Sequence, residues 1–139
     1  MPWQDDLDFG NKWQSWYIER AQPREVEVMK GNFKPYDAVL DGVKHEFKAE
    51  KLIAKYGNIC IEYRSRDKPS GIMTTEADYY VIMSIVADKV DELWKVPTQT
   101  LRNMIDAKVY HRDTKGGDNW ANQMFLFKKE LFSPYRVEV

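Results

Sequence analysis

A short hairpin that carries acidic residues is the feature that most constrains how this chain folds. The stretch PYDAVLDGVKHEFK, residues 35–48, holds an Asp-Gly pair between two short runs that suit β-strands. Asp-Gly in this setting is a strong signal for a tight turn. Because side chains alternate between the two faces of a strand, Glu46 and Lys48 point to one face. If Asp37 lies opposite them on the paired strand, two carboxylates and an ammonium group converge on one place.

The approach of Asp37 to Glu46 would be unfavourable without a bound cation, because neighbouring carboxylates repel and raise one another's pKa. Mg²⁺ prefers oxygen ligands from Asp, Glu, water and substrate phosphate. Lys48 would then be placed to hold an attacking water or to offset charge on a phosphoryl oxygen. The sequence therefore predicts a Mg²⁺ site, with Mn²⁺ as an alternative ion. The structural alternative is a surface hairpin whose charges are solvated.

A further acid, Glu62, lies in the next apolar run, NICIEY at residues 58–63. The run suits a buried strand, where a carboxylate is costly unless it is paired or binds a metal. Glu62 is therefore a candidate site residue, and its structural alternative is a salt bridge to a nearby Lys or Arg. Cys60 in the same run is expected in the core. A single cysteine excludes an internal disulfide and fits a reducing compartment.

The pattern Asp37…Glu46-Phe47-Lys48 resembles the signature of the PD-(D/E)XK nuclease superfamily, whose small members include the archaeal and phage Holliday junction resolvases. One residue separates the proline from the aspartate here, where the signature has Pro-Asp. The resemblance implies an α/β fold, a mixed sheet with flanking helices and a restriction-endonuclease-like αβββαβ core. It implies metal binding by Asp37, Glu46 and the backbone carbonyl of Phe47. The expected catalytic residues are Asp37, Glu46, Lys48 and Glu62.

The resemblance implies a metal-dependent DNA endonuclease, a hydrolase of phosphodiester bonds that serves DNA recombination. The 139 residues are expected to form a single nuclease domain, 1–139, without room for a separate sequence-reading domain. This favours recognition of DNA shape, such as a four-way junction or other branched DNA, by a homodimer whose subunits each cut one strand. The size would suit a phage-encoded protein, and the expected location is the cytoplasm, the host's if a phage encodes it.

Two alternatives remain open. One is a non-catalytic nucleic-acid-binding or assembly module on the same fold, for which five tryptophans and eight tyrosines could provide a protein interface. The intact set of two acids and a lysine argues against this alternative. The other is a restriction-type or single-strand-specific nuclease. Metal titration and a cleavage assay separate the binding module from either nuclease.

DNA binding requires a local basic surface, because the chain has a net charge of −1 and nucleic-acid binders are usually basic. Acids crowd the start of the sequence and basic residues crowd its middle. The segment 64–75, RSRDKPSGIMTT, is expected to be a polar loop that contacts DNA or is simply solvated. The residues expected to contact DNA are Arg64, Arg66, Lys68, Ser70 and Lys115.

The remaining elements follow from periodicity and from breaker residues. A helix is expected over residues 3–21, and the resemblance makes Gln14 or Glu19 on it a possible site residue, the alternative being a solvated face. Strands are expected at 24–30, 79–86, 90–96 (at or near the sheet edge) and 120–127, helical turns at 50–57 and 128–131, and helices opening near Thr74 or Thr75 and near Thr98. Residues 110–119 are expected to be irregular. No apolar run approaches 18 residues, so no membrane span is expected.

Overall fold

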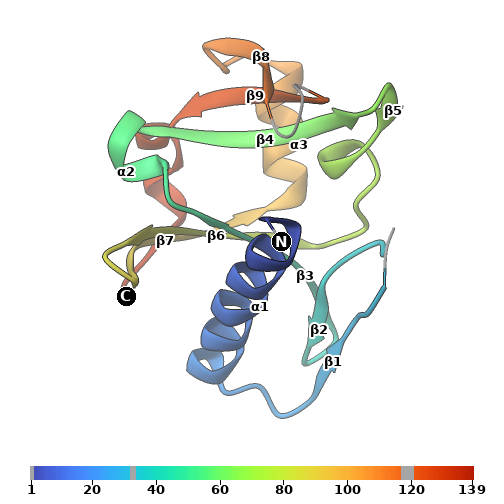
Figure 1. Ribbon diagram of the computed structural model, residues 1–139, viewed down its shortest axis with the longest axis vertical. Helices are drawn as coiled ribbons and strands as arrows, with labels where there is room; N and C mark the ends of the chain where they lie inside the picture. The colour runs from blue at the N-terminus through green and yellow to red at the C-terminus, as the bar shows by residue number, and fades with distance from the viewer. Residues whose placement is uncertain (1, 32–33, 117–120) are drawn as a thin grey trace.

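The computed structural model describes residues 2–31, 34–116 and 121–139, which form two β-sheets with helices packed around them (Figure 1). The larger sheet has the strand order β1-β2-β3-β6-β7-β10 and the smaller sheet has the order β5-β4-β9-β8. The expected mixed α/β class is confirmed. In the described part of the chain, no helix is both long and apolar enough to cross a membrane.

The strands and helices have the following bounds. The larger sheet comprises β1 (Val26–Val28), β2 (Ala38–Leu40), β3 (Val43–Glu50), β6 (Tyr79–Val86), β7 (Lys89–Pro97) and β10 (Arg136–Val137). The smaller sheet comprises β4 (Asn58–Ser65), β5 (Lys68–Pro69), β8 (Arg112–Gly116) and β9 (Asn122–Lys128). The helices are α1 (Pro2–Ala21), α2 (Ile53–Tyr56), α3 (Thr98–Asp106) and the 3₁₀ segments η1 (Gly71–Met73) and η3 (Lys129–Tyr135).

The hairpin of β2 and β3 is confirmed. Asp41 has φ 49° and Gly42 has φ 79°, so both turn residues adopt the left-handed conformation that a two-residue hairpin turn requires. On its other side β3 pairs in parallel with β6, with Glu46 opposite Tyr80 and Lys48 opposite Ile82. The other described strand pairs are antiparallel. The hairpin therefore feeds an internal strand of the larger sheet.

Two hydrophobic cores lie on opposite faces of the larger sheet. On one face α1 packs through Trp13 and Tyr17 against β2, β6 and β7, with Phe47 of β3 among its neighbours. On the other face the larger sheet packs against the smaller one through side chains that include Tyr80, Trp94 and Phe127, joined by residues of α2, α3 and η3. Because its side chains alternate, β3 turns Phe47 toward α1 and Glu46, Lys48 and Glu50 away from it.

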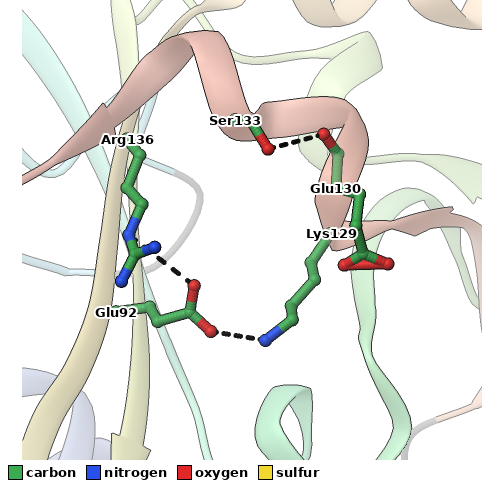
Figure 2. A network of polar contacts seen from close by, with 5 residues as sticks. All are labelled: Glu92, Lys129, Glu130, Ser133 and Arg136. Atoms are coloured by element: carbon green, nitrogen blue, oxygen red, sulfur yellow. Dashed lines mark hydrogen bonds and ion pairs between the residues drawn. The ribbon is translucent and has the colours of Figure 1, made fainter.

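The strand β7 lies near the edge of the larger sheet, as expected, with the short C-terminal strand β10 paired to its outer side. Glu92 of β7 anchors this last segment: its Oε1 lies 2.5 Å from Lys129 Nζ and its Oε2 lies 3.7 Å from Arg136 Nε (Figure 2). Ser133 Oγ donates a 2.8 Å hydrogen bond to the Glu130 carbonyl within η3. Lys129 at the start of η3 and Arg136 just after it thus both pair with the Glu92 carboxylate.

The smaller sheet is the main departure from the predicted elements. Residues 64–75, expected to be a loop, continue β4 to Ser65, turn at residues 66 and 67 and return as β5. Residues 110–119, expected to be irregular, contain β8, while residues 117–120 lie outside the described residues. The strand β8 has no apolar alternation and exists through pairing with β9, so its own sequence gives no strand signal.

One local prediction was also wrong. The helix expected from Thr74 or Thr75 is absent, because tertiary contacts take its backbone groups: Arg102 Nη2 donates to the Ile72 and Thr75 carbonyls. The helix expected near Thr98 is confirmed as α3, with Pro97 at the cap position and Thr98 Oγ1 buried without a partner. The strand expected at 24–30 is confirmed as the shorter β1, whose three residues are exposed.

Gly71 is the position where the backbone geometry is most restrictive. Its φ is +54°, and a Cβ there would lie 2.2 Å from the Glu62 carbonyl oxygen. We therefore expect Gly71→Ala to lower the free energy of unfolding by about 2–3 kcal/mol in urea denaturation. Gly10→Ala is the matched control: a Cβ at Gly10 in α1 meets no atom within 4 Å, so it should stabilise by about 0.5–1 kcal/mol. Unchanged stability of Gly71→Ala would contradict the packing of η1 against β4.

Candidate functional site

Asp37 lies just before β2. It adjoins the part of β3 that continues past the end of β2 and is not paired with it. Its N–H donates to the His45 carbonyl at 2.9 Å. Its carboxylate Oδ2 accepts a 2.8 Å hydrogen bond from the backbone N–H of Phe47, and Oδ1 lies 3.2 Å from Lys34 Nζ. The carboxylate thus accepts the hydrogen bond that a neighbouring strand would otherwise accept from the Phe47 N–H, between Glu46 and Lys48. The predicted meeting of Asp37 with the second strand is confirmed.

Glu46 is the neighbouring carboxylate, and its Oε2 is buried without a hydrogen-bond partner. Burial above all, then the charge of Asp37 and a hydrogen bond to it, raise the pKa of Glu46 to about 8, against the opposing charges of Lys34 and Lys48. When ionised, Glu46 leaves a buried acceptor without a donor; when protonated, it can donate to Asp37. The pair therefore requires either a shared proton or a cation.

Lys48 follows on the same face of β3 and pairs with Glu50, whose Oε1 lies 3.1 Å from Lys48 Nζ. Burial lowers the pKa of Lys48, but the charge of Glu50 and the hydrogen bond to it, with smaller contributions from Cys60 and Glu62, outweigh burial and raise the pKa above its usual value. Lys48 is therefore protonated at neutral pH. It can act as a cation and hydrogen-bond donor, not as a proton acceptor.

Glu62 lies on β4 in the smaller sheet. Its Oε2 accepts a 2.8 Å hydrogen bond from Ser70 Oγ. Its charge makes a small contribution to the raised pKa of both Lys48 and Tyr80. Cys60, expected in the core, is only half-buried, although burial still raises the pKa of its thiol. Ser70, one of the residues expected to contact DNA, therefore hydrogen-bonds Glu62.

The first helix contributes Gln14 and not Glu19. Gln14 is 9% exposed and lines a cavity of about 160 Å³ between α1 and β3, together with Lys34, Asp37 and Phe47. Glu19 is exposed and does not line this cavity. The amide of Gln14 thus shares this cavity with Asp37, as do Asp6 and Asn11 of α1.

Three residues of the site were missed by the sequence analysis. Glu50 continues the alternation of Glu46 and Lys48, so extending the strand by two residues would have found it. Lys34 pairs with Asp37 across three positions of the chain. Tyr80 lies opposite Glu46 on β6, and burial followed by the charge of Glu46 raises the pKa of its hydroxyl strongly. No local signal indicates Tyr80, because its placement depends on the parallel pairing.

The predicted DNA-contacting residues lie on the smaller sheet. Arg64, Arg66 and Lys68 are exposed in the hairpin of β4 and β5, and Lys115 is exposed on β8. Arg64 Nη2 donates to the Asp67 carbonyl at 3.3 Å, across the tip of the hairpin. The fold brings the hairpin and β8 into one sheet, although 51 positions separate Arg64 from Lys115 in the sequence.

The donor set at Asp37 and Glu46 fits a divalent cation in part. Both side chains offer oxygen, and the orphaned Glu46 Oε2 is an unused buried acceptor. No three His, Cys, Asp or Glu side chains gather as a metal site in residues 2–31, 34–116 and 121–139. A cation here would therefore take its remaining ligands from backbone carbonyl groups, water or substrate.

A larger cavity of about 850 Å³ lies away from these acids, between α1, α2 and the turn after β6. Its charges are largely balanced: Lys12 Nζ lies 2.5 Å from Asp88 Oδ1, and Lys51 Nζ lies over the Phe9 ring at 4.7 Å. None of the predicted site residues lines this cavity. The larger cavity and the predicted catalytic residues therefore lie in different parts of the fold.

The raised pKa of Glu46 predicts a specific dependence of stability on pH. The folded state holds a proton up to about pH 8 that the unfolded chain loses near 4.5, so the free energy of unfolding should fall as the pH rises through this range. Glu46→Gln removes this contribution. In denaturant melts without divalent cations, the variant should gain stability over the wild type from about pH 5 to about pH 9. Glu27→Gln, an exposed change in β1, is the control and should show the same pH dependence of stability as the wild type. If Glu46→Gln also showed the wild-type pH dependence, the pKa of Glu46 would not be raised.

Comparison with known proteins gave no match. No protein-family model, no curated protein and no solved structure matched the chain. The fold and the geometry of the site are therefore what a functional proposal can be built on.

Proposed function

We propose that the chain is a metal-dependent DNA endonuclease that hydrolyses phosphodiester bonds. Its active site would comprise Asp37, Glu46 and Lys48. The observation that carries the proposal is the acid pair: Glu46 keeps a buried oxygen without a donor, beside a second carboxylate. Lys48 lies two residues further on the same face of β3. A fold has no structural need for such a pair, because burying an unpaired carboxylate costs free energy.

The order of elements supports the same proposal. Helix α1 precedes an antiparallel meander of β1, β2 and β3, and a crossover then leads to β6, which is parallel to β3. This order fits an αβββαβ core whose crossover comprises α2, β4, β5 and η1. Asp37 precedes the second strand and the other two residues lie on the third, as the resemblance to PD-(D/E)XK nucleases implies.

The metal ligands would be Asp37, Glu46 and the Phe47 carbonyl, with Mg²⁺ as the ion and Mn²⁺ as its alternative. When bound, the ion supplies Lewis-acid stabilisation of the phosphoryl oxygens. The Phe47 N–H holds the Asp37 carboxylate in place through the 2.8 Å hydrogen bond. Gln14, on the other side of Asp37, can orient water in the small cavity that they share.

Lys48 supplies positive charge where negative charge develops on the phosphoryl group. Its ammonium group is fixed by Glu50 and remains protonated, so it can donate a hydrogen bond to the attacking water or to a non-bridging oxygen. Glu62, which accepts a hydrogen bond from Ser70, adds negative charge that also raises the pKa of this lysine. Proton removal from the water would then fall to a carboxylate or to solvent.

The substrate we propose is branched DNA such as a four-way junction, bound by a homodimer whose two subunits nick two strands. The support is the resemblance and the size of the chain. The proposed location of this activity is the cytoplasm, or the host cytoplasm if a phage encodes the protein.

A second candidate is a nucleic-acid-binding module without catalysis. It is favoured by the ion pairs that already neutralise the site, Lys34 with Asp37 and Lys48 with Glu50. The absence of a three-residue metal cluster among the described residues also favours it. A module of this kind would bind DNA equally well with and without Mg²⁺.

The two candidates differ in a cleavage assay on labelled linear duplex, single strand, flap and four-way junction with Mg²⁺ or Mn²⁺. Asp37→Asn and Glu46→Gln should each abolish cleavage while the protein stays folded, because each removes a predicted ligand. Lys48→Ala should lower the rate by about 10²–10³-fold and still bind DNA, because its charge acts mainly in the transition state.

Glu27→Gln and Lys89→Ala are the matched controls, since both residues are exposed and lie outside the site. They should cleave at the wild-type rate. Cleavage by Asp37→Asn or Glu46→Gln at the wild-type rate would remove the acid pair from the mechanism. A wild-type protein that binds the panel and cleaves none of it would favour the binding module.

A further inference from the structure

A row of polar residues crosses the smaller sheet near the hairpin of β4 and β5. Arg64 of β4 is paired with Gln123 of β9, and Gln123 is paired with Lys115 of β8. Directly paired residues share a face of a sheet, so these three side chains lie on one face. Arg64 and Lys115 are exposed and Gln123 is half-buried. Two cations thus flank an amide across three neighbouring strands.

A β-bulge creates this row. The register shifts between Glu62, paired with Met124, and Arg64, paired with Gln123. Met124 and Gln123 are consecutive and point to opposite faces, so the bulge turns Arg64 to the face opposite Glu62. Arg64 therefore lies at the exposed end of the face that carries Phe125 and Phe127 and packs on the larger sheet, whereas Glu62 lies on the opposite face.

Three stacked aromatic rings continue this face toward the core. The ring of Phe125 lies 4.2 Å from the Tyr63 ring and 4.3 Å from the Tyr110 ring, centroid to centroid, at angles of 17° and 27°. Tyr63 Oη donates a 2.7 Å hydrogen bond to Asp113, which fixes the outer ring in place. Tyr63 is half-buried and ends the stack, with no second ring against it in the described part of the chain.

The charge of the smaller sheet differs from that of the rest of the fold. Its four strands carry five basic side chains, Arg64, Lys68, Arg112, Lys115 and Lys128, and two acidic ones, Glu62 and Asp113. Helix α1 carries four acidic and two basic side chains. A chain with a net charge of −1 therefore concentrates positive charge on the sheet that holds the row and the aromatic stack.

We propose that the exposed end of this face, where Arg64, Gln123 and Lys115 lie, binds an unpaired DNA strand. Arg64 and Lys115 contact phosphates, Gln123 hydrogen-bonds a base between them, and a base stacks on Tyr63. The two cations are two strand spacings apart, about 10 Å, which leaves room for a nucleotide over Gln123. An unpaired strand fits better than a duplex, because only an unpaired base offers a free ring face to Tyr63. The proposal rests on DNA as the ligand in the proposed function, but not on cleavage.

The first test measures binding of labelled oligodeoxythymidine by fluorescence anisotropy in EDTA, at several salt concentrations. The double variant Arg64→Ala/Lys115→Ala should bind at least about tenfold more weakly and lose about 1.4 from the slope of log affinity against log salt, for two phosphate contacts. Arg24→Ala/Lys89→Ala removes the same charges from exposed positions outside the smaller sheet and should lose less in both quantities. Equal losses in the two double variants, or no loss in the first, would overturn the proposal.

The second test concerns stacking. Tyr63→Leu should weaken oligonucleotide binding by about 5- to 100-fold, whereas Tyr63→Phe keeps the ring and should stay within about twofold of the wild type. Circular dichroism checks the fold, and Gln123→Ala replaces Tyr63→Leu as the test if the latter does not fold. Equal affinity for a duplex of the same length through the same residues would overturn the proposal. Because EDTA prevents cleavage, an inactive nuclease could still pass both tests.

Discussion

The parallel pairing of β3 with β6 is the constraint on which the rest of this structure depends. Parallel neighbours need a long crossover, and here the crossover comprises α2, β4, β5 and η1. The crossover carries the chain to the face of the larger sheet opposite α1, where β4 is the first strand of the smaller sheet. As a result the larger sheet is covered by a helix on one face and by the second sheet on the other (Figure 1).

This arrangement explains why charged side chains can persist on an internal strand. Glu46, Lys48 and Glu50 lie on the face of β3 opposite Phe47, where Lys48 pairs with Glu50 and the charge of Glu62 also raises the pKa of Lys48. Lys48 is stabilised by Glu50, but the Asp37–Glu46 pair is not complete within the protein, since Glu46 Oε2 has no donor. We interpret this incomplete pair as a site that awaits a cation, and the ion pair of Lys48 as preorganised charge beside it.

The hairpin and its chemistry were predictable from local sequence, because they depend on one turn and on strand alternation. Asp-Gly fixed the turn, and alternation placed Glu46 and Lys48 on one face. The resemblance pointed to Gln14 or Glu19 on the first helix, and only Gln14 lines the cavity beside Asp37. Non-local features were not predictable: β8 exists only through pairing with β9, Tyr80 reaches Glu46 only through the parallel register, and the Ile72 carbonyl of η1 accepts a hydrogen bond from Arg102 of the distant helix α3. Local propensity cannot report contacts between distant segments.

The central claim is that Asp37 and Glu46 hold either a shared proton or a divalent cation. Calorimetric titration with Mn²⁺ at about pH 7, in two buffers with different ionisation enthalpies, tests it directly, because the difference between the heats counts released protons. The account predicts saturable binding to the wild type with release of close to one proton per ion. Glu46→Gln should bind more weakly and release almost none. Binding without proton release, or the same release from Glu46→Gln, would contradict it.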